Sequence, residues 1–370
     1  MIATYAFAGE SDLTFQTPCR PENNLAVISF VGDVLIHRAL YETVASETKH
    51  FTQLWKKAEP LFKKADFSVG NLEGPAALGI DSGGKNHGDI GFIYDNYVYS
   101  GTNFSFNYHP RILSDLLNSG FDLMTFANNH SLDRLAIGID KTLAASKSAG
   151  LPLVGARMSS TPDAPFYKIA SINNIKTAFI GCTEMTNGNN DSKNQILHCY
   201  DNANRILGLI KTLHDRSDVD AVIVYTHWGT EYSQSPEKSQ REFGRKYIEY
   251  GATAVIGSHP HVLQPWEKVV TKDGREGLIL YSLGNFVAGQ AGLARRTGPV
   301  AYLGLSKAAS KNEKASIFGV GYTPTLRTGA VITPVGKKDS PDVTAYVTKM
   351  FGTKAFIAPG EDLKPVMCGK

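Results

Sequence analysis

Short apolar runs alternate with longer segments of helical periodicity through most of the chain. The runs are rich in β-branched and aromatic residues, so each predicts a β-strand. The predicted strands are Ala26–Val31, Phe67–Val69, Leu123–Phe126, Thr177–Ile180, Ala221–Tyr225, Ala254–Ile256 and Leu278–Tyr281. Helical spacing of apolar residues predicts helices at Phe51–Lys64, Arg111–Ser119 and Glu237–Tyr250. Such alternation is typical of a layered α/β fold.

The pattern changes near Gly298, where alternating apolar runs replace the strand and helix repeat. The runs Val300–Leu305, Ala330–Val335 and Val343–Val347 predict further strands. We therefore expect the last part of the chain to complete a sheet of the same domain. The expected organisation is an N-terminal extension, a main domain and a β-rich completion of that domain, at residues 1–24, 25–290 and 291–370.

The segment Gly79–Pro110 is rich in Gly, Asn, Asp and Tyr and has few aliphatic residues. A stretch of about 30 residues without regular structure is uncommon inside a compact domain unless it binds something. Two interpretations stay open, a solvated insertion and a substrate-covering loop. The second would use the aromatic anchors Phe92, Tyr94, Tyr97 and Tyr99.

The composition excludes several classes of protein. The 370 residues, 42% hydrophobic and 20% charged, suffice for one large domain or two of ordinary size. The net charge of +3 comes from 38 basic and 35 acidic residues that are interspersed, so nucleic acid is not an expected partner. No uncharged apolar run approaches the roughly 20 residues that span a bilayer, so no transmembrane segment is predicted.

Two features bear on the compartment. Ala6-Phe7-Ala8 has the small-x-small pattern that ends a signal peptide, although a complete signal peptide is not recognisable. The four cysteines at positions 19, 182, 199 and 368 lack C-x-x-C spacing and permit either two disulfides or four buried thiols. We expect an exported protein, periplasmic or associated with the cell surface, and the alternative is a cytoplasmic one.

Side chains that can bind metal ions directly follow several predicted strands. They are Asp33; Asn71 and Glu73; Asn128, Asn129 and His130; His227; His259 and His261; and Asn285. In an open α/β sheet the carboxyl ends of the strands line one crevice, so we expect these side chains to converge.

The types of these side chains suggest the chemistry. Two carboxylates, an amide and at least three imidazoles without thiolate suit zinc, manganese, iron or cobalt. Six ligands exceed the needs of one tetrahedral ion, so a carboxylate such as Glu73 can bridge two ions, as in hydrolases that activate water between metals. His259-Pro260-His261 is the most specific element, because proline stiffens the loop and both imidazoles can face one centre. The residues alone predict metal-assisted hydrolysis or acyl transfer and leave the electrophile open.

Six groups of motifs between residues 26 and 290 occur in a characteristic order. They are Gly32–Asp33, Asn71–Pro75, Gly120–Asp122 with Ala127–Asp133, Thr226–Tyr232, Gly257–Gln264 and Tyr281–Phe286. In this order they resemble the bacterial capsule synthesis CapA (poly-γ-glutamate capsule biosynthesis) proteins, which are related to calcineurin-like metallophosphoesterases. The resemblance implies a four-layer α/β sandwich of two mixed β-sheets flanked by helices, with a dinuclear site at one sheet edge.

The resemblance also implies roles for individual residues. It suggests Asp33 and His261 as ligands of one ion, Glu73 as the bridge, and Asn129, His227 and His259 as ligands of the other ion. His130 falls where the phosphoesterases have a proton-donating histidine, and Asp133 is placed to orient it. The implied cofactors are two divalent transition-metal ions, manganese, zinc or iron.

Two positions depart from the phosphoesterase pattern. Leu35 stands where those enzymes have a histidine two residues after the first aspartate. His37 is a possible substitute, although a solvent-facing helix residue is the simpler interpretation. Glu73 replaces an aspartate, which lengthens the bridge.

Further polar residues extend the motifs. Candidates for substrate contact, or for hydrogen bonds that orient a ligand, are Asn71, Glu231, Tyr232, Gln264, Asn285 and Arg296. We favour ligand support for Glu231 and Asn285. Arg296 and its neighbour Arg295 offer a guanidinium fork for a carboxylate or phosphate, and the alternative is a solvated pair of charges.

The predicted function is that of a metal-dependent hydrolase or acyl transferase. The resemblance suggests poly-γ-glutamate or a related capsular or cell-wall polymer, so the expected partner is an anionic polymer or peptide-like substrate. The alternatives are a non-catalytic polymer-binding component of capsule assembly and a phosphoesterase. The sequence does not predict the oligomeric state.

Overall fold

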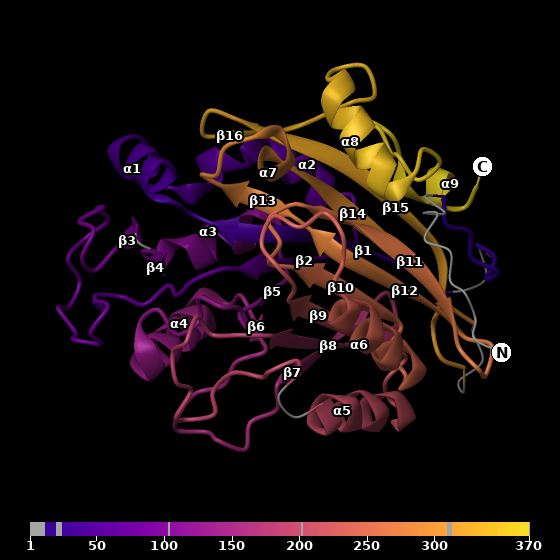
Figure 1. Ribbon diagram of the computed structural model, residues 1–370, viewed down its shortest axis with the longest axis horizontal. Coiled ribbons are helices and arrows are strands. Elements are labelled where there is room, and N and C mark those ends of the chain that lie inside the picture. Colours follow the sequence, from indigo (N-terminus) through magenta and orange to yellow (C-terminus); the bar gives the residue numbers. More distant parts are fainter. Residues whose placement is uncertain (1–11, 20–23, 103, 201–202, 309–312, 370) are drawn as a thin grey trace.

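Two mixed β-sheets form the centre of the computed structural model, which describes residues 12–19, 24–102, 104–200, 203–308 and 313–369 (Figure 1). The order of the eight-stranded sheet is β16 (Val331–Pro334), β15 (Ser316–Thr328), β14 (Thr297–Lys307), β1 (Asn24–Leu35), β2 (Phe67–Leu72), β5 (Leu123–Thr125) and β6 (Leu153–Val154), with β13 (Asn285–Ala288) paired to β1. The order of the six-stranded sheet is β11 (Leu263–Val270), β12 (Glu276–Leu283), β10 (Ala254–Ser258), β9 (Ala221–His227), β8 (Ile175–Thr183) and β7 (Tyr167–Ile172). The seven strands predicted in the first 290 residues are confirmed.

The central strands are buried on both faces, which explains their nearly continuous apolar sequences. Val27 of β1 packs toward helices, whereas its neighbour Ile28 packs into the core between the sheets. Val222 and Ile223 of β9 divide in the same way. Parallel pairing of β1 with β2 and of β9 with β10 brings their carboxyl ends to a common edge in each sheet.

Helices cover the outer face of each sheet. Those on the eight-stranded sheet are α1 (Arg38–Ser46), α2 (Glu59–Phe62), α3 (Arg111–Ser119) and α4 (Leu135–Ala149). Those on the six-stranded sheet are α5 (Ala203–Asp215) and α6 (Lys238–Glu249). The remaining described helices are α7 (Leu293–Arg296), α8 (Pro341–Phe351) and α9 (Leu363–Met367). The predicted four-layer sandwich of two mixed sheets flanked by helices is confirmed (Figure 1).

The helix predictions had mixed outcomes. Helix α3 has the predicted bounds, and α6 follows Glu237, whose side chain forms a capping box with Gln240. The prediction of one helix at Phe51–Lys64 was wrong, because two 3₁₀ turns precede the short α2. Pro60 lacks the backbone N–H that a continuous helix would need at this position.

The strand predicted at Val343–Val347 was also wrong, because this segment lies within α8. Val343, Val347 and Met350 are spaced by four and three residues, which puts them on one buried helical face. Pro341 suits the first turn of this helix. The β-branched residues favour a strand, but their spacing is that of a helix.

The segment Gly79–Pro110 is mostly irregular, as expected, and contains a hairpin of β3 (Ser100–Thr102) and β4 (Ser105–Asn107). Phe92 and Tyr99 are buried and pack against the Tyr41 ring of α1. These rings therefore anchor the segment to the core. Whether the segment covers a substrate stays a prediction.

The four cysteines form two disulfides, Cys19–Cys368 and Cys182–Cys199, which decides between the two alternatives. The Ala6-Phe7-Ala8 pattern lies outside the described residues. Among the described helices, none combines the length and the apolar character needed to cross a bilayer.

Candidate metal centre

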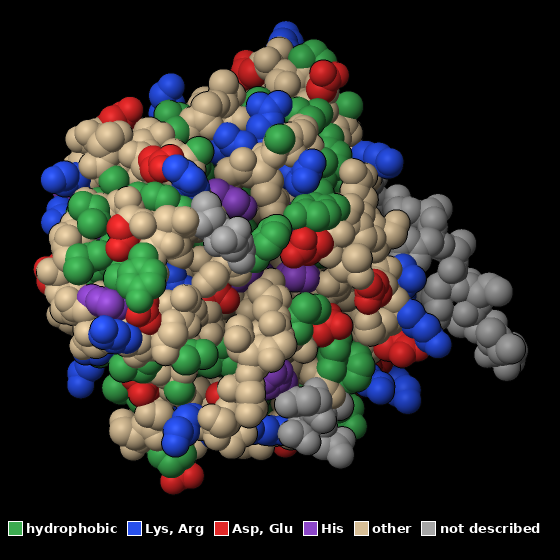
Figure 2. Space-filling view, turned by 60° about the vertical axis from the view of Figure 1, so that its left-hand side comes forward, with side chains coloured by type: hydrophobic (Ala, Val, Ile, Leu, Met, Phe, Trp, Pro, Cys, Tyr) green, Lys and Arg blue, Asp and Glu red, His purple; other side chains and the backbone are tan. Residues whose placement is uncertain are grey.

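The carboxyl ends of strands from the two sheets meet at one end of the sandwich. Asp33 of β1 and Glu73, directly after β2, come from the eight-stranded sheet. His227 at the end of β9 and His259 and His261 after β10 come from the six-stranded sheet. All five side chains are buried. Figure 2 shows histidine and acidic side chains recessed near the centre of one face.

Within the described residues, two groups of three side chains hold their ligand atoms within 4.8 Å of one another. One group is Glu73, His227 and His259, and the other is Asp33, Glu73 and His261. Glu73 belongs to both groups, which is the position of a carboxylate between two ions. The Asn129 amide oxygen lies 2.8 Å from Nε2 of His227, so it adds an oxygen donor beside the first group.

The surroundings of Glu73 indicate whether this set of residues fits metal ions. Both of its carboxylate oxygens are buried and have no hydrogen-bond partner among the described residues. Burial, and then the charge of Asp33, raise the pKa of Glu73 to about 8. A buried carboxylate without a hydrogen-bond partner is costly unless a cation compensates it. The residues present therefore fit divalent ions.

The histidines of the first group are also in a form that suits a metal. Burial lowers the pKa of His227 to about 3 and that of His259 well below the ordinary value. Neutral imidazole is the ligand form of histidine. Nδ1 of His259 lies 3.1 Å from Nε2 of His227, so their nitrogens already face one point.

Asp33 and His261 form a coupled pair in the second group, with 3.1 Å between Oδ2 and Nδ1. Burial alone would raise the pKa of Asp33, but the hydrogen bond and charge of His261 outweigh it and lower the pKa to about 2. Burial alone would lower the pKa of His261, but Glu73 and Asp33 raise it to about 9. Without an ion, this imidazole serves as the counter-charge of Asp33.

The His259-Pro260-His261 loop has a constrained backbone. His259 and His261 both have positive φ, +96° and +58°. Such conformations cost about 1 to 3 kcal/mol each in non-glycine residues and are typical of functional sites. The loop thereby aims both imidazoles at the carboxylates of β1 and β2.

Asn71 supports both sides of the centre rather than facing a pocket. Its Nδ2 donates to Oδ1 of Asp33 at 2.8 Å and lies 3.3 Å from Nδ1 of His227. Its Oδ1 accepts hydrogen bonds from Thr125 and Asn128, both at 3.1 Å. Because all these groups are buried, Asn71 fixes the orientation of an aspartate and a histidine together.

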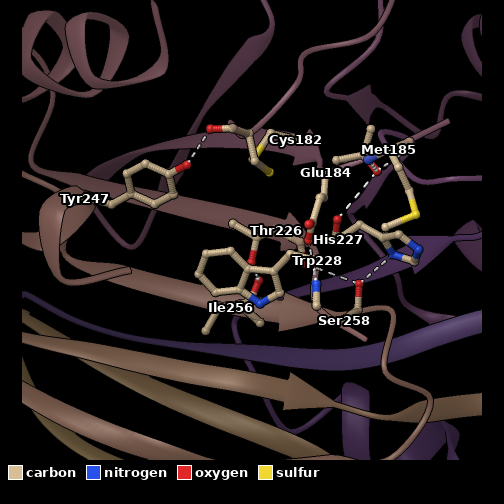
Figure 3. The surroundings of a disulfide bond; sticks show 12 residues. Cys182, Glu184, Met185, Thr226, His227, Trp228, Tyr247, Ile256 and Ser258 are labelled. Carbon is tan, nitrogen blue, oxygen red and sulfur yellow. Dashed lines mark hydrogen bonds between the residues drawn. A yellow bond between two sulfur atoms is a disulfide. The ribbon is translucent and has the colours of Figure 1, made fainter. Parts of the chain in front are cut away.

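Sequence reasoning missed two supporting residues. Ser258 lies beside His227 in the register of β9 and β10, and its hydroxyl is 3.0 Å from Nδ1 of His227 (Figure 3). It stands in the Gly257–Gln264 motif, which was a signal for it. Asn187 accepts a hydrogen bond from Asn129 at 3.3 Å, and no sequence motif marked it.

His130 and Asp133 lie beside the centre at a pocket of about 520 Å³. Nδ1 of His130 is 2.8 Å from Oδ2 of Asp133, which also accepts the Phe106 backbone N–H at 2.7 Å. Burial alone would lower the pKa of His130, but the Asp133 carboxylate outweighs it and raises the pKa. Glu231 lines the same pocket.

The other predicted contacts divide into two sets. Gln264 is turned into the fold, where it accepts from Gln240 and donates to the Ser233 carbonyl. Asn285 donates to the backbone carbonyl of His261 at 3.3 Å and so supports the histidine loop. Both residues brace loops rather than face a pocket.

Tyr232 and the paired arginines lie on the outer side of His261. The Tyr232 ring is exposed and 6.2 Å from the His261 ring. The guanidinium of Arg296 donates to the Arg327 carbonyl, whereas that of Arg295 lies 5.0 Å above the Tyr232 ring. Of the two arginines that the sequence suggested, Arg295 is therefore the one beside the centre.

His37 differs from both interpretations of the sequence. Leu35 is buried in the apolar core, and His37 is half-buried directly before α1. Nδ1 of His37 lies 3.1 Å from the Gly289 backbone N–H, and His37 belongs to neither ligand group. It is not the solvent-facing helix residue that we expected.

Most of the chain matches one known protein family. Residues 27–290 match the model described as "Bacterial capsule synthesis protein PGA_cap". The chain belongs to this family. The matched segment contains both ligand groups and the His130–Asp133 pair.

Two curated relatives agree with the family. The chain is 29% identical to "Capsule biosynthesis protein CapA" of Bacillus anthracis over 272 residues, which cover 73% of this chain and 61% of that protein. It is 29% identical to "PGA biosynthesis protein CapA" of Bacillus subtilis (strain 168) over 280 residues, 75% of this chain and 67% of that protein. The match thus leaves more than a third of the first relative uncovered.

The similar solved structures have low sequence identity to this chain. The Haemophilus influenzae NAD nucleotidase NadN superimposes with a TM-score of 0.49 at 13% identity, over 92% of this chain and 58% of that one. A 5'-nucleotidase precursor from Thermus thermophilus gives a TM-score of 0.47 at 13% identity, over 88% of this chain and 57% of that one.

Proposed function

We propose that this chain is a metal-dependent hydrolase, or an acyl transferase, that acts on poly-γ-glutamate or a related capsular or cell-wall polymer. The observation that carries the proposal is the pair of ligand groups that share the buried Glu73, next to a histidine and aspartate pair at a pocket. The family and the names of the curated relatives support the link to capsule polymer.

Two divalent ions, manganese, zinc or iron, would be held by the predicted ligands Asp33, Glu73, Asn129, His227, His259 and His261. Such ions supply Lewis acidity, which favours deprotonation of water and stabilises negative charge that develops in a transition state. The chain's own contribution is to bury the ligands and fix their orientation. Asn71 and Ser258 do this through hydrogen bonds to Asp33 and His227.

His130 is the proposed proton donor to the leaving group. Asp133 and Asn187 contact Nδ1 of its ring, so Nε2 is the nitrogen that can give a proton to a group in the pocket. The Asp133 carboxylate stabilises the protonated ring. A binding module would have no need of such a pair, which favours an enzyme over a non-catalytic component.

The location of the protein is part of the proposal. We expect it to be exported, since disulfides persist in oxidising compartments and both cysteine pairs are closed. The family's link to capsule synthesis agrees with this location.

A substrate panel tests the function. Purified protein incubated with manganese, zinc or iron should cleave a γ-glutamyl amide polymer faster than matched esters or phosphate monoesters. The double variant His259→Ala, His261→Ala should lose this activity, whereas His214→Ala, a histidine change on the outer helix α5, should retain it. Faster cleavage of phosphate monoesters would favour a phosphoesterase, and binding of the polymer without cleavage of any substrate would favour a non-catalytic component.

A further inference from the structure

Three arginines gather beside the candidate metal centre without an acidic partner among the described residues. Arg295 and Arg296 end α7, and Arg327 lies on the neighbouring strand β15, whose Leu326 is in register with Thr297. The ion pairs of arginines in the described part of the chain involve others, namely Arg38, Arg216, Arg245 and Arg275.

The positions of these guanidinium groups are set by neutral contacts. Arg327 donates from Nη2 to the Gln290 carbonyl at 2.7 Å, and its buried Nε has no hydrogen-bond partner within the described ranges. Arg296 donates to the Arg327 carbonyl at 3.2 Å. Burial, and then the charge of Arg296, lower the pKa of Arg327. Like charges held together in this way repel one another unless an anion binds between them.

Arg295 is fixed relative to the metal centre. Its guanidinium lies 5.0 Å above the Tyr232 ring, which in turn is 6.2 Å from the ring of His261. Asn285 donates from one amide nitrogen to the carbonyls of both Arg295 and His261, at 2.9 and 3.3 Å. Tyr232 has a positive φ of +64°, and its N–H donates to the Pro260 carbonyl at 2.7 Å. One set of contacts therefore positions Arg295 and the histidine loop together.

A pocket of about 360 Å³ lies at this place, and Arg295, Tyr232, Gln234, Val262 and Leu293 line it. Its lining contains the guanidinium group of Arg295, the phenol of Tyr232 and the apolar side chains of Val262 and Leu293. The larger pocket is lined by the Asp133 and Glu231 carboxylates together with the His130 imidazole. The lining of the smaller pocket contains Arg295 and no acidic residue, so an anionic group would enter this pocket.

We propose that this pocket is a carboxylate subsite that binds the α-carboxylate of a γ-linked glutamate unit next to the bond held at the metal centre. A guanidinium binds a carboxylate through two parallel hydrogen bonds, and the Tyr232 ring keeps the fork in place. The remaining two arginines attract further carboxylates of the same polymer. This inference rests on the proposed function, because it names the part of the polymer that the protein recognises.

Direct binding tests the subsite. The probes are a γ-linked glutamate pentamer and the same pentamer with its α-carboxylates converted to amides, measured by calorimetry at fixed salt. Arg295→Gln should weaken binding of the pentamer about 10- to 100-fold, the range of a lost charge-assisted hydrogen-bond pair. It should leave binding of the amide form and the metal content unchanged. Arg295→Lys, which keeps the charge but not the fork, should fall between.

A matched control is Arg216→Gln, since Arg216 pairs with Asp218 near the start of β9 and lies outside both pockets. This variant should bind the pentamer like the wild type. Equal pentamer binding by wild type and Arg295→Gln would overturn the proposal, as would an equal loss for both pentamers. Inorganic phosphate is the third probe, and tighter binding of phosphate than of the pentamer through Arg295 would overturn the choice of a carboxylate.

Turnover separates this proposal from the proposed function. If the pentamer binds through Arg295 but is never cleaved, the subsite stands and the hydrolase fails. If the polymer is cleaved and Arg295→Gln binds it normally, the hydrolase stands and the subsite fails.

Discussion

Asn71 is a useful residue for separating support of a metal centre from ligation, because its amide nitrogen donates to Asp33 and its amide oxygen accepts from Thr125 and Asn128. Asn71→Ala would leave Asp33 free to turn and would remove the partner of Thr125. We expect metal affinity to fall about 10- to 100-fold, as is usual when a ligand loses its supporting hydrogen bond. Titration against a chelator of known affinity measures this, and unchanged affinity would show that packing alone orients the ligands.

His130 is the residue that separates proton transfer from ligand binding. General acid assistance contributes about 10²- to 10⁴-fold to a rate, so His130→Ala should lower kcat by that factor and leave the metal content unchanged. The penalty should shrink for substrates with good leaving groups, because these need no proton.

The comparison of leaving groups is the control for this prediction. A histidine that only braces its loop would give the same penalty with good and poor leaving groups. Loss of metal in His130→Ala would assign the residue to the ligand set instead.

At the scale of elements, the Cys182–Cys199 disulfide joins the end of β8 to the segment that follows the Asn187 loop. Figure 3 shows its surroundings, where Tyr247 of α6 donates to the Cys199 carbonyl. Both cysteines are fully buried and separated by 17 positions. Loops of this length predict about 3 kcal/mol of stabilisation from a disulfide.

The double variant Cys182→Ala, Cys199→Ala should therefore unfold at a lower denaturant concentration, with a free energy of unfolding lower by about 3 kcal/mol. The loop that contains Asn187 should also become more sensitive to proteolysis, because it loses its closure. An unchanged midpoint and an unchanged cleavage pattern would mean that the surrounding core holds the loop without the disulfide.

At the scale of the whole molecule, the candidate ligands come from both sheets. Asp33 and Glu73 belong to one sheet and His227, His259 and His261 to the other, so bound ions would link the two. A ligand that binds only the folded state stabilises it by about 2.7 kcal/mol at a free concentration of about 100 times Kd. Tm should therefore rise by several degrees with metal and fall on chelation, and a Tm independent of metal would contradict this linkage.

Much of the fold was predictable because a strand that is buried on both faces has a nearly continuous apolar sequence. Strand β9 is such a case, since each of its residues is buried. The errors came where one local rule outweighed another. Phe51–Lys64 has helical spacing, but Pro60 interrupts the hydrogen bonds, and Val343–Val347 has β-branched residues at helical spacing.

The residues of the candidate centre that directly follow a strand were predictable, because parallel strands bring their carboxyl ends to one edge of a sheet. The family resemblance implied a dinuclear site at one sheet edge, and the division of the ligands between two sheets did not follow from the sequence. Asn187 was not predicted, because its position depends on a loop whose tertiary contacts leave no period in the sequence. Ser258 was quoted within a motif, but only the register of β9 and β10 shows its partner.

The most direct test of the account is the metal stoichiometry of the wild type and of Glu73→Gln after incubation with manganese or zinc and removal of free ions. Glu73 belongs to both ligand groups, and its carboxylate oxygens have no hydrogen-bond partner in the described part of the chain. We predict about two ions per chain in the wild type and fewer than about one in the variant, because coordination needs the full set of donors. A wild type that retains almost no metal, or a variant that still holds two ions, would contradict the account.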